Sequence, residues 1–394
     1  MRKTIILLLF IATQSVLGQS NEYLILISWD GCRWDYLNRD LTPNVQKLID
    51  NGVRAKSLKP SFPSKTFPNH YTIVTGLYPK NHGIIFNRFT NMQSGNSYRI
   101  ERDSSIHQDK WYKGETLWVT AKKHGIKSGV VFWPGSETNL KHPDYFLNYD
   151  HNLSHEKRVD QLMEWITYPE EKRPHLLLLY FPDTDDYGHE YGPDSEELND
   201  VVKTLDNTLG DLIKRLKNAG IYEQTNIVLT SDHGMTNLYR ENSIDIDSML
   251  TGFDYTTNGN DPNLTFFADS SQLNQMFEIL KKNEKGYTVS WQNEIPVELN
   301  YFGNQHLGKF SIMAKPGYYL KNKSWGPSKG SHGFDNRIKD MHGVFVAHGP
   351  AFKNGAEIEV LQNIDIYPLL CKALKIEANS KIDGKLNRVK HLLK

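Results

Sequence analysis

Short apolar runs alternate with amphipathic segments along most of this chain. Five runs have the length of a strand and little polar content, at residues 23–29, 127–132, 175–181, 226–230 and 343–347. Between them, the residue pattern indicates helices, at residues 42–52, 115–125, 155–166, 195–220 and 364–374. Apolar strands that alternate with helices are typical of a parallel sheet covered on both faces. The pattern therefore predicts an α/β fold with a mostly parallel central sheet flanked by helices.

Residues 239–329 break this alternation, with mixed turns, short strands and one helix near residues 272–281. We expect a smaller inserted α+β segment here, because a separate domain would need a larger core of its own. The chain has 394 residues and 38% hydrophobic content, which is enough to bury a substantial core. We therefore predict a single domain over residues 19–394.

The first 18 residues have the pattern of a secretory signal peptide. Arg2 and Lys3 precede an apolar run at residues 5–12, and the small residue Gly18 offers a cleavage point. The run is too short to span a bilayer comfortably, and no second apolar stretch of spanning length follows it. We expect an exported protein, either periplasmic or secreted, from which residues 1–18 are removed.

The charge balance and the cysteine count limit the kinds of binding partner and of disulfide that we expect. Lysine plus arginine (46) equals aspartate plus glutamate (46), so no basic surface argues for binding a nucleic-acid polymer. The two cysteines, Cys32 and Cys371, are too few for a disulfide scaffold. We expect two buried free thiols, and a single bridge between them is the alternative. A small-molecule substrate fits this composition better than a polymer.

The stretch at residues 60–71 holds a hydroxyl where a helix should begin. Three prolines fix the path of the chain there, and Pro68 suits the first turn of a helix that ends at Gly76. The N-terminus of a helix presents unpaired N–H groups and a positive dipole end, which together favour a phosphate. Thr66 is therefore the candidate nucleophile. The simpler alternative is that Thr66 only caps the helix.

Carboxylates follow the ends of three predicted strands. Asp30 and Asp232 come just after their strands, and Asp185 lies a few residues past its own. Ligands of open α/β sheets bind beyond the carboxyl ends of the strands, so the topology can bring these side chains together. Imidazoles stand close to these segments or in a glycine-flanked turn, at His189, His233 and His332. Carboxylates and imidazoles without thiolates suit zinc or a similar divalent cation.

Six segments carry a resemblance to a known family. They are Asp30-Gly31 and residues 62–71, 75–84, 185–189, 231–234 and 332–336. Together they resemble the nucleotide pyrophosphatase/phosphodiesterase family of the alkaline phosphatase superfamily, in order over nearly the whole chain. The resemblance implies an alkaline-phosphatase-like fold, one catalytic phosphodiesterase domain and two zinc ions. One zinc would be held by Asp185, His189 and His332, and the other by Asp30, Asp232, His233 and the reactive Thr66.

The resemblance also implies the chemistry. Zinc lowers the pKa of a coordinated oxygen by several units, so Thr66 could attack phosphorus as an alkoxide. The implied reaction splits a nucleotide phosphodiester or pyrophosphate bond through a covalent phospho-threonine and releases a nucleoside 5′-monophosphate. The Asn87 amide matches the family position that binds a phosphate oxygen together with the Thr66 backbone N–H. A neutral amide suits a singly charged diester, but the adjacent Arg88 leaves a phosphomonoesterase as an alternative.

Aromatic residues carry the expected substrate recognition. Phe67 and Tyr180 match family positions that sandwich a nucleobase, and Trp133 and Tyr149 match less closely. Each of these four could instead belong to the core. Related members cleave choline-containing phospholipids with the same metals, so a choline-phosphate or lysophospholipid phosphodiesterase is a rival. A zinc-stabilised binding protein without catalysis is a rival of another class.

The chain departs from the family pattern at one point. Many members carry Glu-Pro directly before the metal aspartate, where this chain has Asp183-Thr184. The spacing to Gly188-His189 favours Asp185 over Asp183 as the ligand. We assign the remaining histidines of interest to packing or surface roles, namely His70, His82, His342 and His348.

Overall fold

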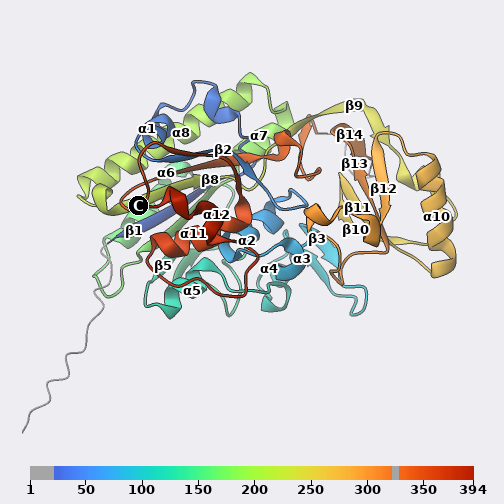
Figure 1. Ribbon diagram of the computed structural model, residues 1–394, viewed down its shortest axis with the longest axis horizontal. Coiled ribbons are helices and arrows are strands. Elements are labelled where there is room, and N and C mark those ends of the chain that lie inside the picture. The colour runs from blue at the N-terminus through green and yellow to red at the C-terminus, as the bar shows by residue number, and fades with distance from the viewer. Residues whose placement is uncertain (1–21, 322–327) are drawn as a thin grey trace, which may run out of the picture.

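The computed structural model describes residues 22–321 and 328–394, and an eight-stranded sheet forms its centre (Figure 1). From edge to edge the strands are β17 (Ala356–Gln362), β2 (Val53–Lys59), β16 (Gly343–His348), β8 (Thr225–Thr230), β1 (Tyr23–Trp29), β7 (Leu176–Phe181), β5 (Ser128–Val131) and β6 (Tyr145–Leu147). Of these strands, β16 alone runs antiparallel to its neighbours. The predicted mostly parallel sheet is confirmed. The predicted signal peptide, residues 1–18, lies outside the described residues.

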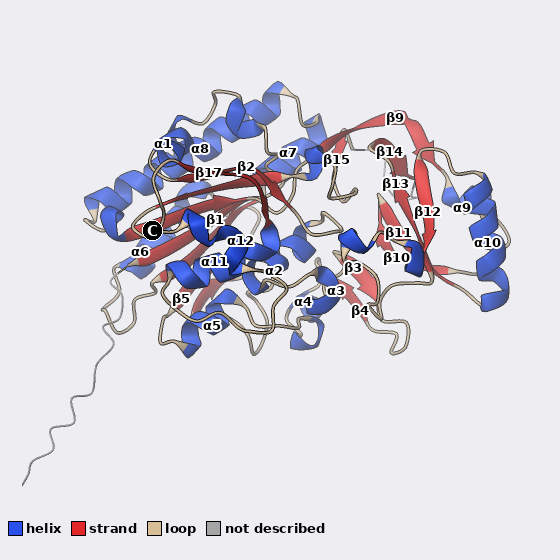
Figure 2. Cartoon of the chain, in the orientation of Figure 1, coloured by secondary structure: helices blue, strands red, loops and turns tan. Residues whose placement is uncertain are grey.

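Helices cover both faces of this sheet (Figure 2). One face packs under α2 (Thr66–Thr75), α5 (Leu117–Lys123), α11 (Ile366–Ala373) and α12 (Leu386–Val389), and the other under α1 (Pro43–Asp50), α6 (His155–Ile166) and α8 (Glu196–Asn218). Successive side chains of a strand point to opposite faces. Leu24 and Leu26 of β1 accordingly join the first core, whereas Ile25 and Ile27 join the second.

The longer helices begin and end within two residues of the predicted positions. Ser195 caps α8, since its hydroxyl accepts a hydrogen bond from the Leu198 backbone N–H. Gly76 ends α2 in a left-handed conformation with φ of 66°, which a residue with a side chain adopts reluctantly. Shorter helices lie between the main elements, namely α3 (Pro79–His82), α4 (Asp103–Ile106), α7 (Asp183–Tyr191) and α9 (Ile246–Met249).

The segment that breaks the alternation builds a second, smaller sheet at the end of the molecule opposite β1 in the view of Figure 1. Its antiparallel strands lie in the order β10 (Thr256–Asn260), β11 (Asn263–Phe267), β13 (Phe310–Ala314) and β12 (Tyr287–Trp291). Helix α10 (Ser270–Lys282) packs on this sheet, with the Phe277 ring stacked 4.4 Å from that of Trp291. Asn258 hydrogen-bonds both backbone groups of Thr90, which ties the segment to the main body.

Two further small sheets lie beside these. One contains β14 (Gly317–Leu320), β9 (Thr236–Ile244) and β15 (Gly330–Ser331), and the other β3 (Arg88–Thr90) and β4 (Ser97–Arg99). Strand β15 ends one residue before His332, so this small sheet delivers a candidate ligand to the main sheet.

Candidate active site

The carboxyl ends of β1, β7 and β8 meet at one edge of the central sheet, because these neighbouring strands are parallel. Asp30 directly follows β1, and Asp232 stands two residues after β8. Strand β7 leads into α7, which carries Asp185 and His189 four positions apart and therefore on one face. The three aspartates predicted to converge thus do so.

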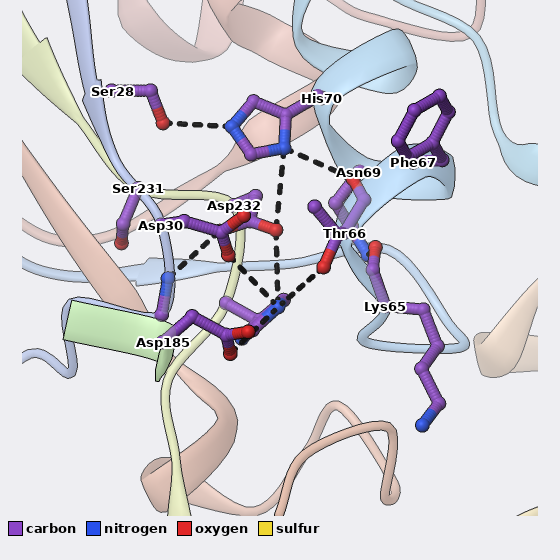
Figure 3. A network of polar contacts seen from close by, with 12 residues as sticks. Ser28, Asp30, Lys65, Thr66, Phe67, Asn69, His70, Asp185, Ser231 and Asp232 are labelled. Atoms are coloured by element: carbon purple, nitrogen blue, oxygen red, sulfur yellow. Dashed lines mark hydrogen bonds and ion pairs between the residues drawn. The ribbon is translucent and has the colours of Figure 1, made fainter. Parts of the chain in front are cut away.

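We call Asp30, Asp232 and His233 the inner cluster. The Nε2 atom of His233 lies 3.4 Å from Oδ1 of Asp30 and 3.1 Å from Oδ2 of Asp232. All three side chains are at most 1% exposed. Figure 3 shows both carboxylates gathered beside Thr66. The inner cluster is therefore a dry pocket of two acids and one imidazole.

We call Asp185, His189 and His332 the outer cluster. The Asp185 carboxylate lies 3.5 Å from Nε2 of His189 and 3.6 Å from Nε2 of His332. One ligand atom from each residue lies within 4.8 Å of the others. The Asp185 Oδ1 atom is also 4.0 Å from Nε2 of His233, so the two clusters adjoin.

Backbone carbonyls orient the three histidines of these clusters. The Nδ1–H groups donate to carbonyl oxygens, at 2.8 Å from His233 to Gly234, 2.7 Å from His332 to Ser64 and 2.8 Å from His189 to Gly330. A histidine that donates from Nδ1 keeps the Nε2 lone pair free for a metal. Each imidazole thus presents its coordinating atom to the carboxylates.

In the inner cluster, the imidazole nitrogen of His233 lies 3.1–3.4 Å from carboxylate oxygens of Asp232 and Asp30. Burial raises the pKa of Asp30 well above its usual value, and the neighbouring Asp232 and Asp185 add to the shift. Burial likewise raises the pKa of Asp232 to about 8 and lowers the pKa of His233 far below its usual value. The neutral imidazole offers a lone pair to carboxylate oxygens, which is unfavourable unless a carboxyl proton or a bound cation lies between them.

Three buried carboxylate oxygens receive no well-aligned hydrogen bond from the described residues, namely Oδ1 of Asp30, Oδ1 of Asp185 and Oδ2 of Asp232. Buried polar atoms of this kind are costly unless a partner satisfies them. Oxygen and imidazole nitrogen donors without thiolate match divalent cations such as zinc. The donor set, the acceptor contacts and the unsatisfied oxygens all fit metal binding at both clusters.

Thr66 opens helix α2, and its hydroxyl faces the inner cluster. Its Oγ1 atom lies 3.4 Å from Nε2 of His233. The cap position belongs to Lys65, which has an extended backbone, so Thr66 is the first helical residue. The alternative that Thr66 only caps the helix is therefore wrong, because a cap must precede the first helical residue.

Asn87 is held directly beside Thr66. Its Oδ1 atom accepts a hydrogen bond of 3.1 Å from the backbone N–H of Phe67. Because the amide oxygen is used in this way, the amide NH₂ group is the part of Asn87 that can donate to a ligand. Arg88 lines the same cavity as Asn87, and its guanidinium there forms an ion pair with Glu101.

A cavity of about 800 Å³ opens onto both clusters and is lined by Thr66, Asn87 and all four predicted aromatic residues. Phe67 is half-buried and Tyr149 is 47% exposed, so both rings present surface to the cavity. Trp133 is 1% exposed, and its indole N–H donates to the carbonyl of His70. Tyr180 is also buried, and its hydroxyl donates to Oδ2 of Asp30 at 2.6 Å. Trp133 and Tyr180 therefore line the cavity but expose little of their ring surface to it.

Gly31 sets the approach of β1 to α7. A side chain at this position would meet the Asp185 Cα atom at 3.0 Å, and the backbone has φ of 66°. Both facts require glycine. The Gly31 backbone N–H also donates to Oδ1 of Asp232 at 3.1 Å. Gly31 thus contacts Asp185 of the outer cluster and Asp232 of the inner cluster.

Two aspartates near the end of β7 have separate partners. Asp183 accepts a hydrogen bond of 2.8 Å from His155, whereas Asp185 lies in the outer cluster. The structure brings Asp185 rather than Asp183 to the other candidate ligands, which supports the choice made from the spacing.

Sequence reasoning missed the position of His70. This residue is fully buried, and its Nδ1 atom lies 3.0 Å from the Thr66 carbonyl oxygen and 3.3 Å from Oδ2 of Asp232. The prediction of a simple packing role is therefore incomplete. The spacing of four residues from Thr66 on one helix could have indicated the contact. His82 and His342 are buried as well, away from both clusters, and His348 stacks on Tyr222.

A family description of type I phosphodiesterases and nucleotide pyrophosphatases matches residues 24–335, which include every candidate ligand. This chain belongs to that family. Among its relatives, human ectonucleotide pyrophosphatase/phosphodiesterase family member 5 is 35% identical over 374 residues, which cover 94% of this chain and 78% of the relative. The bis(5'-adenosyl)-triphosphatase enpp4 of Xenopus laevis is 32% identical over 379 residues, covering 95% and 82%.

Solved structures of the family share the fold. An inactive threonine-to-alanine variant of murine ectonucleotide pyrophosphatase/phosphodiesterase 5, in complex with AMP, superposes with a TM-score of 0.89 at 34% identity. The human protein superposes with a TM-score of 0.90 at 35% identity. Each alignment covers 95% of this chain and 100% of the other. The alkaline-phosphatase-like fold is therefore confirmed.

Family membership makes this protein a hydrolase, and its acidic and imidazole clusters are able to hold metal ions. Within the described residues, no helix is long and apolar enough to cross a membrane. Cys32 and Cys371 are both free and buried, as expected.

Proposed function

We propose that residues 19–394 form a phosphodiesterase domain with two zinc ions that hydrolyses nucleotide phosphodiester or pyrophosphate bonds. Thr66 is the nucleophile, and the product is a nucleoside 5′-monophosphate. The observation that carries this proposal is the position of the Thr66 hydroxyl, 3.4 Å from Nε2 of His233 at the start of a helix.

Two residue sets would hold the zinc ions. The inner cluster with Thr66 would hold one, and the outer cluster would hold the other. When bound, divalent cations at these positions supply the positive charge that lowers the pKa of a nearby hydroxyl and neutralises a transferred phosphate. The murine relative supports a threonine nucleophile, because its threonine-to-alanine variant is described as inactive.

The reaction then needs two displacements at phosphorus. Oγ1 of Thr66 forms a bond to phosphorus as the bond to the leaving oxygen breaks, which gives a phospho-threonine and frees the leaving group. Water then forms a new bond to phosphorus and breaks the bond to Oγ1, which restores Thr66 and frees the monophosphate. The outer cluster is the more exposed of the two and borders the cavity, which suits it to the side where leaving group and water exchange.

The phosphate contacts favour a diester over a monoester. The Asn87 amide NH₂ and the backbone N–H of Thr66 would donate to a non-bridging phosphate oxygen, because the next N–H of α2, that of Phe67, already donates to the Asn87 amide oxygen. These donors are neutral and suit one negative charge. Arg88 is already paired with Glu101. The Glu101 carboxylate thus offsets the positive charge that would bind the second negative charge of a phosphomonoester.

The cavity supports a nucleotide as the substrate. Phe67 and Tyr149 present aromatic surface within it, and aromatic rings stack with nucleobases regardless of base identity. The murine relative was solved with AMP, and the Xenopus relative is named a bis(5'-adenosyl)-triphosphatase. Its setting would be extracellular or periplasmic, after removal of residues 1–18.

The test compares Thr66→Ala with Thr66→Ser in zinc-loaded protein. We expect Thr66→Ala to keep both zinc equivalents and the fold but to lose kcat by several orders of magnitude, whereas Thr66→Ser retains a hydroxyl and measurable turnover. A p-nitrophenyl nucleotide ester, p-nitrophenylphosphorylcholine and p-nitrophenyl phosphate serve as parallel substrates. Near-normal kcat in Thr66→Ala would reject the nucleophile. A preference for the choline ester would reject the nucleotide assignment.

A further inference from the structure

His70 is a fully buried histidine that belongs to neither cluster, yet it lies between the nucleophile and the inner cluster. It follows Thr66 by one turn of α2, and Figure 3 shows its ring with Ser28 on one side and Asp232 on the other. Its Nδ1 atom is 3.0 Å from the Thr66 carbonyl oxygen and 3.3 Å from Oδ2 of Asp232. One ring atom thus contacts the backbone of the nucleophile and a candidate metal ligand.

The contacts identify Nδ1 as a protonated donor. A carbonyl oxygen can only accept a hydrogen bond, so Nδ1 must carry the proton that points toward Thr66. A protonated nitrogen has no lone pair for a metal, although His70, Asp30 and Asp232 are close enough together to suggest a ligand set. His70 therefore differs from His233, which donates from Nδ1 to the Gly234 carbonyl and turns Nε2 toward the carboxylates.

The far side of the His70 ring is fixed in place. The Ser28 hydroxyl of strand β1 lies 2.8 Å from Nε2, and both side chains are fully buried. The ring packs edge-on against Trp133 and Tyr180, with centroid distances of 5.1 and 5.2 Å. The imidazole thus has little freedom to rotate, and β1 determines where its Nδ1–H points.

We propose that His70 is a positioning residue that links Thr66 to Asp232. Its Nδ1–H donates to the first turn of α2 and lies in contact with Oδ2 of Asp232, which fixes the nucleophile relative to the inner cluster before any metal binds. This inference rests on the proposed function, since it assumes that Asp232 holds a metal ion and that Thr66 is the nucleophile. Loss of an outer partner of a metal ligand typically costs about 10–100-fold in metal affinity or activity.

The test uses two amides that mimic different ring nitrogens. In His70→Asn the side-chain NH₂ stands near the former Nδ1 and can donate to Thr66 and Asp232. In His70→Gln it stands near the former Nε2 and reaches only Ser28. His82→Gln is the matched control, because His82 is equally buried, contacts Thr72 and Pro68, and touches neither cluster.

We expect His70→Gln to weaken zinc binding at one site by roughly 10–100-fold in a competition titration with a chromogenic chelator. Its kcat on a p-nitrophenyl nucleotide ester should fall with little change in KM, and His70→Asn should recover most of both losses. His82→Gln should lower the Tm of the metal-free protein without changing zinc affinity. Should His70→Gln fail to fold, Ser28→Ala decides, since loss of this anchor should weaken zinc binding and leave the fold intact.

Wild-type zinc affinity and kcat in His70→Gln would overturn the inference, and so would equal losses in His70→Asn and His70→Gln that match their losses of Tm. Unchanged zinc affinity in Ser28→Ala would overturn it where the glutamine variant is unfolded. Failure of the proposed function looks different, because the wild-type protein itself would then bind no zinc, or Thr66→Ala would remain active.

Discussion

The inner and outer clusters contain similar ligands in different surroundings. Asp30, Asp232 and His233 of the inner cluster are at most 1% exposed. In the outer cluster, Asp185 is 17% and His189 is 33% exposed. The inner cluster lies against Thr66 and contributes Asp30 to the cavity lining, whereas all three residues of the outer cluster line the cavity. Under the proposed function, the dry inner cluster would activate the hydroxyl, and the wetter outer cluster would lie where water and the leaving group reach phosphorus.

This difference in burial predicts that the two similar clusters respond differently to substitution. Removing a partner from a buried charged cluster leaves the others uncompensated, which is more damaging than the same change near water. The inner cluster should therefore tolerate substitution less than the outer cluster. It should also lower the free energy of unfolding more when no metal is bound.

The largest expected effect comes from a matched pair of substitutions. Asp232→Asn should remove one zinc equivalent and abolish turnover, because the inner cluster then retains a single carboxylate beside Thr66. His189→Asn should weaken the other zinc site but leave measurable activity, since solvent can replace an exposed ligand. Elemental analysis and kcat on a p-nitrophenyl nucleotide ester check both. Equal losses in the two variants would break the comparison.

The second effect is a pH dependence of the metal-free protein. The pKa of Asp232 is raised to about 8 by burial, so the folded state keeps a proton that the unfolded state releases near pH 4. A raised carboxyl pKa means that stability falls as pH rises through this range. Burial lowers the pKa of His233 and His332, which acts in the opposite direction, but only below about pH 6.5.

Between about pH 6.5 and 8, the metal-free protein should therefore lose about 1.4 kcal/mol of unfolding free energy per pH unit for each additional bound proton. Zinc replaces these protons, so the loaded protein should lack the slope. Urea unfolding at several pH values measures it, and Asp232→Asn is the control that should flatten it. A metal-free protein that gains stability over this range would contradict the prediction.

The smallest effect concerns the cavity that the outer cluster borders. Stacking on a base contributes about 1–3 kcal/mol, so Phe67→Ala should raise KM for a nucleotide ester by roughly tenfold. The base-free diester bis-p-nitrophenyl phosphate should be spared, because it carries no nucleobase. Initial-rate kinetics on both substrates test this, and equal losses would reject the stacking role of Phe67.

Much of the fold could be predicted because the central strands are apolar on both faces. The sequences of β1, β7 and β8 are short and fully buried runs, which is typical of central strands in a parallel sheet. Strands β2 and β17 were not predicted, because both mix charged with apolar residues. They are the last two strands at one edge of the sheet. The antiparallel direction of β16 was not foreseen, because direction follows from how the chain enters the sheet rather than from composition.

The residues that converge at the two clusters could be named in advance, because the three aspartates follow predicted strand ends and the family resemblance assigns each residue to one set. The partners of those residues could not, since they depend on three-dimensional contacts between distant segments. Tyr180 illustrates this, because its hydroxyl contacts Asp30 across 150 sequence positions while its ring was expected to stack on a base. His70 is a second example, because its Nε2 atom contacts the hydroxyl of Ser28, which lies 42 positions earlier on another element.

The absence of a side chain at Gly31 has a consequence for how this enzyme can vary. A methyl group there would press on the Asp185 backbone and move the outer carboxylate away from the inner one. The separation of the inner and outer clusters thus depends on a residue that offers no side-chain ligand. Mutational scans should find this chemically silent position as intolerant as the aspartates themselves.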